Sequence, residues 1–121
     1  MGYFYIFATI FFTVFGQIVL KWRINGVGSL PDGVSEKVLF LFKLLLDPWI
    51  FGGFLSAFIA SFFWMATMTK FDISFAYPFM SAAFVLVFIF SVLIFQEPVS
   101  WQKIVGLIFI VFGIIITSRA Y

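Results

Sequence analysis

Four long apolar segments alternate with short polar ones along the chain. Charged residues bound each apolar segment and are absent from its middle, which is the pattern that a bilayer enforces because a charge at its centre costs about 3 kcal/mol or more. A bilayer core about 30 Å thick is crossed by roughly 20 helical residues. The pattern predicts one all-α membrane domain, residues 1–121, with four transmembrane helices at about residues 3–21, 49–69, 73–95 and 100–118.

The polar connection between the first two segments has two parts. "NGVGSLPDG", which ends at Gly33, is rich in turn-forming residues. "SEKVLFLFKLLLD", which follows, is too short to span a bilayer and too apolar to remain in water. We expect a short interfacial helix at about residues 35–47, with Ser35 as its N-cap. The alternative is a tilted N-terminal extension of the second transmembrane helix.

The composition excludes several functions. Of the 121 residues, 64% are hydrophobic and 10% are charged, so we expect the lipid bilayer as the chain's main partner. The absence of cysteine and histidine excludes disulfides, thiol chemistry, haem ligation and the usual zinc sites, and we expect no cofactor and no metal. A net charge of +2 without a basic cluster argues against nucleic acid as a partner. No nucleophile, metal set or acid pair is visible, so we expect no enzymatic activity.

Lysine and arginine are distributed unequally between the two ends of the predicted helices. Five lie on the side of the first and third loops and two on the other side: Lys21, Arg23, Lys37, Lys43 and Lys103 against Lys70 and Arg119. Cytoplasmic loops carry an excess of these residues. We therefore expect the first loop in the cytoplasm and both termini outside.

A polar stripe runs along the first predicted helix. Four polar residues recur every four positions and therefore share one helix face: Thr9, Thr13, Gln17 and Lys21. Gly16 beside them offers a place where another helix can approach closely. Since polar groups in a membrane face protein or water, we expect the stripe to face a partner helix or a cavity. The alternatives are that the threonines bond to carbonyl groups of their own helix, that Gln17 only joins two helices, and that Lys21 only reaches the membrane surface.

Several motifs of the chain resemble one known family. They are "GQIVLK" in the first helix and the stretch "FDISFAYPFMSAAFVLVFIFSVLIFQEPVSWQKIVGLIFIVFG" across the third and fourth. Together with the four-helix length, they resemble the small multidrug resistance branch of the drug/metabolite transporter (EamA-like) superfamily. Within it the chain is most similar to the two small subunits of the flippase for aminoarabinose-phosphoundecaprenol. The resemblance covers roughly residues 5–119, and the long first loop is its least matched part.

Two positions separate the chain from the drug-exporting members of that family. Thr13 stands where those members carry the membrane-embedded glutamate that exchanges protons for cations, and Met80 stands where they carry a pocket tryptophan, while Tyr77 matches their pocket tyrosine. The flippase-like subunits also have a small residue in place of the glutamate. The resemblance therefore implies a multi-pass transporter subunit of the bacterial inner (plasma) membrane. Its implied substrate is a polyprenyl-phosphate-linked aminosugar or a similar amphipathic anion.

A groove of hydroxyl and amide groups with a lysine near one mouth suits such a substrate, because hydrogen bonds hold a sugar and a cation holds its phosphate. Six residues are the candidate binding residues: Thr13, Gln17, Lys21, Tyr77, Ser81 and Lys103. Two other functions stay open. One is a small-solute or multidrug exporter of the small multidrug resistance type, and the other is a non-transporting accessory subunit of a membrane glycosyltransferase.

Proline and glycine residues of the last two predicted helices indicate a hinge and a dimer contact. Pro78 lies in the first turns of the third helix and can kink it, which would form a hinge or widen a cavity. Glu97 is either a turn residue or part of a gate at the headgroup level, and Ser100 is the expected N-cap of the fourth helix. Gly106 and Gly113 lie seven residues apart on one face of that helix. We expect a homodimer, or a heterodimer with a related four-helix subunit.

Overall fold

The chain is helical throughout the part that its structure, a computed structural model, describes: residues 2–28 and 30–119 contain helices, turns and no strand. The helices are α1 (Gly2–Asn25), α2 (Val34–Leu44), α3 (Pro48–Lys70), α4 (Ile73–Phe79), α5 (Ala82–Phe95) and α6 (Trp101–Ser118). Four segments are long and apolar enough to cross a membrane: α1, α3, α4 together with α5, and α6. The predicted all-α membrane fold with four transmembrane segments is confirmed.

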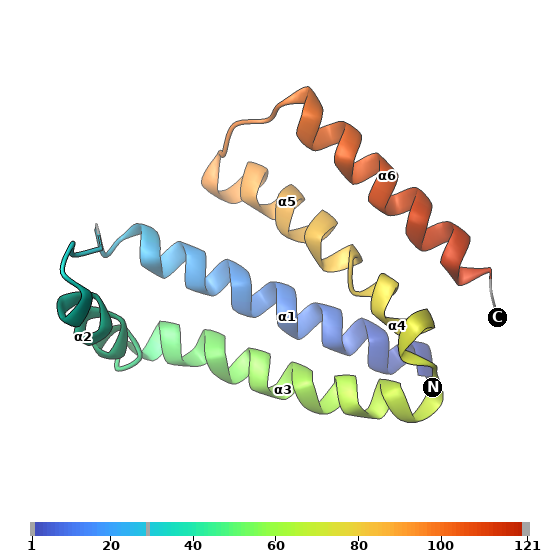
Figure 1. Ribbon diagram of the computed structural model, residues 1–121, viewed down its shortest axis with the longest axis horizontal. Coiled ribbons are helices and arrows are strands. Elements are labelled where there is room, and N and C mark those ends of the chain that lie inside the picture. The colour runs from blue at the N-terminus through green and yellow to red at the C-terminus, as the bar shows by residue number, and fades with distance from the viewer. Residues whose placement is uncertain (1, 29, 120–121) are drawn as a thin grey trace.

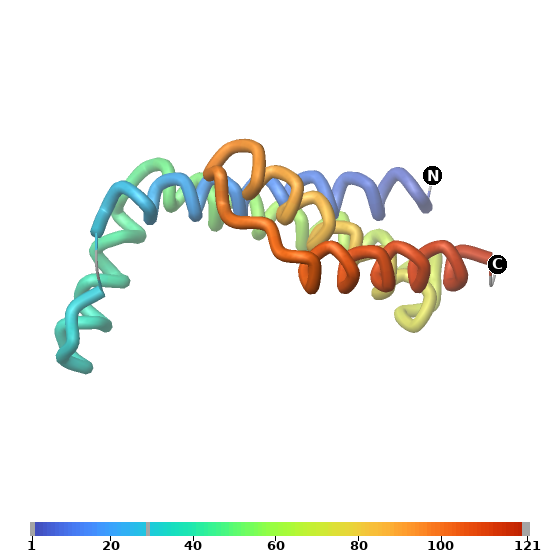
Figure 2. The backbone as a smooth tube through the Cα atoms, turned by 90° about the horizontal axis from the view of Figure 1, so that it is seen from above, coloured from blue at the N-terminus to red at the C-terminus, as the bar shows by residue number. Residues whose placement is uncertain are grey.

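The membrane-spanning helices are arranged around α1. It packs against α3 on one side and against α5 on the other, while α6 packs on α4 and α5 at the outside (Figure 1). The start of α1 and the end of α6 lie at the same end of the bundle (Figure 1). At the opposite end, which we call the loop-one end, α1 finishes, α3 begins, and α2 projects away from the transmembrane helices (Figure 2).

Small residues let α1 and α3 approach closely. A Cβ atom added to Gly16 of α1 would lie only 2.8 Å from the carbonyl oxygen of Gly53 in α3. One turn further along α3, the Ser56 hydroxyl donates a 2.6 Å hydrogen bond to the carbonyl oxygen of Phe12. Close backbone approach and hydrogen bonds between helices replace the hydrophobic driving force that is missing in lipid. This contact holds α1, which carries the polar stripe, against α3.

The contact between α1 and α5 supplies the small apolar core. Ile6, Ile10 and Val14 lie one turn apart on α1 and pack with Ala83 of α5. Many of the other large apolar side chains are exposed on the single chain. Outward-facing apolar residues are expected where the solvent is lipid rather than water.

The third transmembrane segment covers residues 73–95 as predicted, but it is interrupted within that range, near the proline that was expected to distort it. Met80 and Ser81 separate α4 from α5, and their backbone N–H groups bond back only three residues, to Tyr77 at 2.9 Å and to Pro78 at 3.0 Å. Proline has no N–H group and its ring crowds the turn before it, so Pro78 removes one regular hydrogen bond within α4. The break itself begins two residues after Pro78.

The first loop forms a separate helix that is fastened to the start of α3. α2 ends at Leu44, and a turn separates it from α3, so the alternative of one continuous extended helix is excluded. α2 begins with Gly33 at its N-cap, so the expectation that Ser35 caps it is wrong. Asp47 caps α3 by accepting a 2.9 Å hydrogen bond from the Trp49 N–H group.

An ion pair and an aromatic pair join the end of α1 to the start of α3. The Arg23 guanidinium lies 2.7 Å from the Asp47 carboxylate, and this hydrogen bond is the main cause that lowers the pKa of Asp47 below its ordinary value of 3.8. The Trp22 and Trp49 rings meet edge to face with their centroids 5.3 Å apart. Tryptophan is the aromatic residue typical of membrane interfaces. Loop one is thus held to the bundle at the level where α1 ends and α3 begins.

The connection from α5 to α6 is short. Gln96 ends α5 with a left-handed backbone, φ 53°, and Glu97 follows, half-buried. The Ser100 hydroxyl accepts a 3.3 Å hydrogen bond from the Lys103 N–H group, which confirms Ser100 as the N-cap of α6. Glu97 therefore lies in the connection between α5 and α6, and both interpretations of it, as a turn residue and as part of a gate, stay predictions.

Helix α6 is the least packed of the transmembrane helices. None of the residues 101–118 is buried. Side chains added at Gly106 or Gly113 would meet open space within 4 Å. The helix therefore keeps the face with both glycines free for another chain, and the dimer contact stays a prediction.

Candidate functional site

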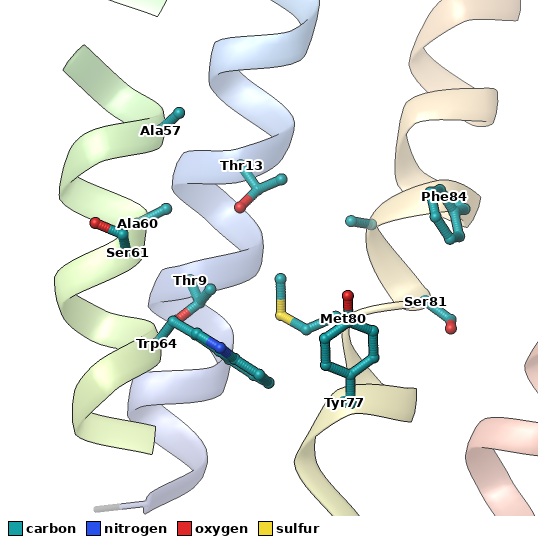
Figure 3. Close-up of a pocket in the computed structure, with 11 residues that line it drawn as sticks. Thr9, Thr13, Ala57, Ala60, Ser61, Trp64, Tyr77, Met80, Ser81 and Phe84 are labelled. Atoms are coloured by element: carbon teal, nitrogen blue, oxygen red, sulfur yellow. The ribbon is translucent and has the colours of Figure 1, made fainter. Parts of the chain in front are cut away.

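A pocket of about 380 Å³ lies between α1, α3 and the interrupted third segment (Figure 3). We call it the hydroxyl pocket. Its lining combines small, aromatic and hydroxyl-bearing residues: Thr9, Thr13, Ala57, Ala60, Ser61, Trp64, Tyr77, Met80, Ser81, Ala83 and Phe84. The break at Met80 and Ser81 contributes both of its residues to this lining, so the interruption after Pro78 shapes the pocket wall.

The structure brings together some of the predicted binding residues. Thr13 of α1, Tyr77 of α4 and Ser81 at the break line the hydroxyl pocket. Gln17 and Lys21 are exposed further along α1, outside this lining. With a rise of 1.5 Å per residue, Lys21 is about 12 Å from Thr13 along the helix axis. The stripe therefore begins in the pocket and leads away from it toward the loop-one end.

Lys103 lies in a different place. It is exposed in the first turn of α6, and its ammonium group donates a 3.0 Å hydrogen bond to the carbonyl oxygen of Pro98. This bond holds the lysine over the α5–α6 connection. The structure therefore does not bring Lys103 to the hydroxyl pocket.

Two hydroxyl groups of the pocket already donate to their own helices. The Thr9 hydroxyl donates to the carbonyl oxygen of Tyr5 at 2.7 Å, and the Ser61 hydroxyl donates to that of Phe58 at 2.6 Å. Thr9 therefore lines the pocket, as the polar stripe predicts, and also bonds to a carbonyl group of its own helix, as the alternative interpretation holds. Such bonds satisfy the donor and leave the oxygen as an acceptor only.

Trp64 is the pocket residue that sequence reasoning missed. Its indole ring and the Tyr77 ring meet nearly edge to face, with centroids 5.7 Å apart and planes at 77° (Figure 3). Trp64 comes from α3 and supplies a second aromatic surface beside Tyr77. The drug exporters carry their pocket tryptophan at the position of Met80, in the third transmembrane segment. One signal could have indicated it: Trp64 lies inside an apolar segment, whereas Trp22, Trp49 and Trp101 lie at segment ends.

The hydroxyl pocket carries no charged side chain in its lining. Hydrogen bonds from Thr13 and Tyr77 and the aromatic faces of Trp64 and Tyr77 are what it offers a ligand. Within residues 2–28 and 30–119, no group of three histidine, cysteine, aspartate or glutamate side chains could hold a metal ion. The pocket is therefore suited to the uncharged, ring-shaped or hydroxyl-bearing part of a ligand.

Comparisons with known proteins identify the family. The model of the EamA-like transporter family matches residues 1–119. The chain is 30% identical to the probable 4-amino-4-deoxy-L-arabinose-phosphoundecaprenol flippase subunit ArnF of Proteus mirabilis (strain HI4320), over 98% of this chain and 92% of that subunit.

Relatives from other bacteria carry similar names. The chain is 27% identical to the probable flippase subunit ArnE of Pseudomonas aeruginosa (strain UCBPP-PA14), over 93% of each chain. It is 29% identical to the probable subunit ArnF of Aeromonas salmonicida (strain A449), over 97% of this chain and 78% of that one. No solved structure matches the chain. With four membrane-spanning segments and a family match over nearly its whole length, the chain belongs to the EamA-like transporter family, a family of multi-pass membrane proteins.

Proposed function

We propose that the chain is a subunit of a flippase that moves a lipid-linked sugar, such as a polyprenyl-phosphate-linked aminosugar, across the bacterial inner membrane. The observation that carries the proposal is the hydroxyl pocket, which lies within the transmembrane helices and combines hydroxyl groups with aromatic and small apolar side chains and no charged lining residue. The names of the relatives, which are probable subunits of an aminoarabinose-phosphoundecaprenol flippase, support the same substrate class.

The chemistry of the pocket suits a sugar ring better than it suits a proton-coupled cation. Thr13 and Tyr77 can exchange hydrogen bonds with sugar hydroxyls, and the Trp64 face can stack on the apolar side of the ring. A membrane-embedded acid would repel the phosphate of such a substrate, and Thr13 stands where the drug exporters carry one. The long prenyl chain has no need of the pocket, since it can stay in the surrounding lipid.

Lys21 is the proposed partner of the phosphate. It is exposed at the loop-one end of the same helix face that begins at Thr13. A cation at that level meets the phosphate where the substrate enters, if loop one is cytoplasmic as the excess of lysine and arginine predicts. Gln17 lies between the two residues and can bond the head group on its way to the pocket.

A second subunit is part of the proposal. α6 buries none of its residues, and Gly106 and Gly113 leave room for a closely packed helix. We propose that this face pairs with the same helix of a second copy, or with that of a related four-helix subunit. The relatives are themselves named as subunits, of two kinds.

The test is transport in vesicles that contain the purified chain, alone or with a related four-helix subunit. Fluorescently tagged polyprenyl-phosphate aminosugar is placed in both leaflets, and an impermeant reagent measures how fast the inner pool reaches the outer leaflet. We expect transport that falls in Thr13→Val and Trp64→Ala but not in Leu39→Ala, which lies on α2 outside the pocket. Exchange at the rate of protein-free vesicles, for every subunit combination, would refute the proposal.

One observation favours a second candidate, a multidrug exporter. The Trp64 and Tyr77 rings form an aromatic pair of the kind that holds organic cations. The drug exporters bind the coupling proton at a glutamate, and this chain has Thr13 in its place. Such an exporter would therefore need a different coupling ion. Robust resistance of cells to quaternary ammonium compounds, conferred by the unaltered chain, would favour the exporter.

A further inference from the structure

A second cavity lies at the loop-one end, apart from the hydroxyl pocket. It has a volume of about 440 Å³ and lies between α2 and the facing ends of α1 and α3. Nine apolar residues line it, among them Leu20 and Ile24 of α1, Leu41 of α2, and Ile50 and Phe54 of α3. We call it the loop groove.

The loop groove and the hydroxyl pocket lie on one side of the α1–α3 pair. On α1, Thr13 lines the pocket, Leu20 lies seven residues later in the groove, and Ile24 follows four residues after Leu20. These spacings are close to two turns and one turn of a helix, so the three residues share one helix face. On α3, Phe54 of the groove and Ser61 of the pocket are again seven residues apart. The two cavities therefore follow each other along the same helix faces, with Gln17 exposed between them.

Two lysines lie close in the sequence to residues that line the groove. Lys21 follows Leu20 in α1, and Lys37 lies one turn before Leu41 in α2. Neither lysine forms an ion pair with a carboxylate in the part of the chain that the structure describes, whereas the Arg23 guanidinium is engaged by Asp47. The groove thus combines an apolar interior with unpaired positive charge at the membrane surface.

We infer that the loop groove is the docking site for an anionic prenyl-phosphate lipid in the leaflet on the loop-one side. The first isoprene units of the lipid lie under α2, between Leu41 and Ile50, and its phosphate lies against Lys21 and Lys37. A lipid held there has its head group at the start of the path through Gln17 to Thr13. This inference rests on the proposed function, because it assigns the entry point of the same substrate.

The charge near the groove favours this occupant over an ordinary neutral lipid. A neutral lipid would satisfy the apolar lining equally well but would gain nothing from the two lysines. Basic residues near a membrane surface attract anionic head groups.

The experiment uses a polyprenyl monophosphate that carries a diazirine close to its phosphate. The full-length chain is reconstituted in phosphatidylcholine vesicles, irradiated with this probe, and digested so that mass spectrometry locates the cross-links. We expect cross-links within residues 20–24, 38–45 and 50–54, reduced by unlabelled polyprenyl phosphate and not by the uncharged polyprenol. Equal competition by polyprenol, or cross-links spread evenly over the helices, would overturn the inference.

Matched variants test the groove and its charges separately. Leu41→Trp fills the groove and should abolish labelling, while Leu39→Trp, on the opposite side of α2, should not. Lys21→Gln and Lys37→Gln should each lower labelling about fivefold, whereas Lys43→Gln, on the side of α2 opposite Leu41, should leave it unchanged. Unchanged labelling in Leu41→Trp, or in the two lysine variants together, would overturn the docking site.

The same vesicles separate this inference from the proposed function. Transport of the lipid-linked sugar without labelling of the loop groove would overturn the docking site and leave the flippase proposal standing. Labelling of the groove without transport would support the docking site and count against the flippase.

Discussion

Substitution of Gly16 by alanine should loosen the contact on which the hydroxyl pocket depends. The added Cβ atom would lie 2.8 Å from the carbonyl oxygen of Gly53, where ordinary contacts begin at 3.4 Å. Both partners are backbone within helices, so no flexible side chain can move aside. α1 and α3 must therefore separate by about 0.6 Å to bring that distance from 2.8 to 3.4 Å.

The same displacement weakens the hydrogen bond beside it. The Ser56 hydroxyl bonds to the Phe12 carbonyl oxygen at 2.6 Å, and a shift of that size carries the pair toward the limit of a good hydrogen bond. Overpacking of a tight contact costs about 1–3 kcal/mol, and a hydrogen bond between membrane helices contributes about 0.6 kcal/mol on average. We expect Gly16→Ala to lower the free energy of unfolding by about 1.5–3 kcal/mol.

Denaturation by sodium dodecyl sulfate in mixed micelles, followed by tryptophan fluorescence, measures this loss. Gly52→Ala in α3 is the matched control, because an added Cβ atom there meets nothing within 4 Å. This variant should be no less stable than the unaltered chain, since alanine favours a helix over glycine. If Gly16→Ala and Gly52→Ala unfold at the same detergent fraction, then the close approach of α1 and α3 does not support the fold as argued.

Other changes test charge and assembly. The lowered pKa of Asp47 means that its carboxylate stabilises the fold at neutral pH. This stabilisation is lost as the pH falls from about 3.8 through the lower pKa of the folded state. Acid unfolding should therefore depend less on pH in Asp47→Asn. The unaltered chain should give no resistance to quaternary ammonium compounds, whereas Thr13→Glu should bind them with release of protons, as calorimetry in buffers of different ionisation heat would show. Gly106→Leu and Gly113→Leu should yield monomers in mild detergent by light scattering, and unchanged dimers in both would place the contact elsewhere.

Hydropathy and length sufficed to predict the transmembrane segments, because the bilayer imposes both on any helix that crosses it. The resemblance to the EamA-like family was likewise readable from short motifs. Details within the segments could not be predicted from the sequence. Pro78 predicted a distortion, yet the position of the break at Met80 and Ser81 depends on how α4 and α5 pack on different neighbours, and the sequence contains no record of that.

The candidate site was predicted only where helix periodicity could decide it. Spacing placed Thr9, Thr13, Gln17 and Lys21 on one face of α1, but the rotation of one helix relative to another is set by tertiary contacts such as those at Gly16. This is why Thr13 and Tyr77 line one pocket, whereas Lys103 lies against the carbonyl of Pro98. Trp64 escaped notice for the same reason, since its partner Tyr77 belongs to another helix.

The distribution of charge constrains how one such chain can act. On the proposed function, a phosphate that passes Thr13 from the loop-one end would meet no further cation of this chain until Lys70 and Arg119, at the other end of the bundle. Since a bare charge at the bilayer centre costs about 3 kcal/mol or more, the compensating charge must come from elsewhere. An aminosugar carries its own ammonium group, which the Trp64 and Tyr77 rings can attract. A second subunit on the open face of α6 is the other source, and both sources explain why the hydroxyl pocket itself needs no charge.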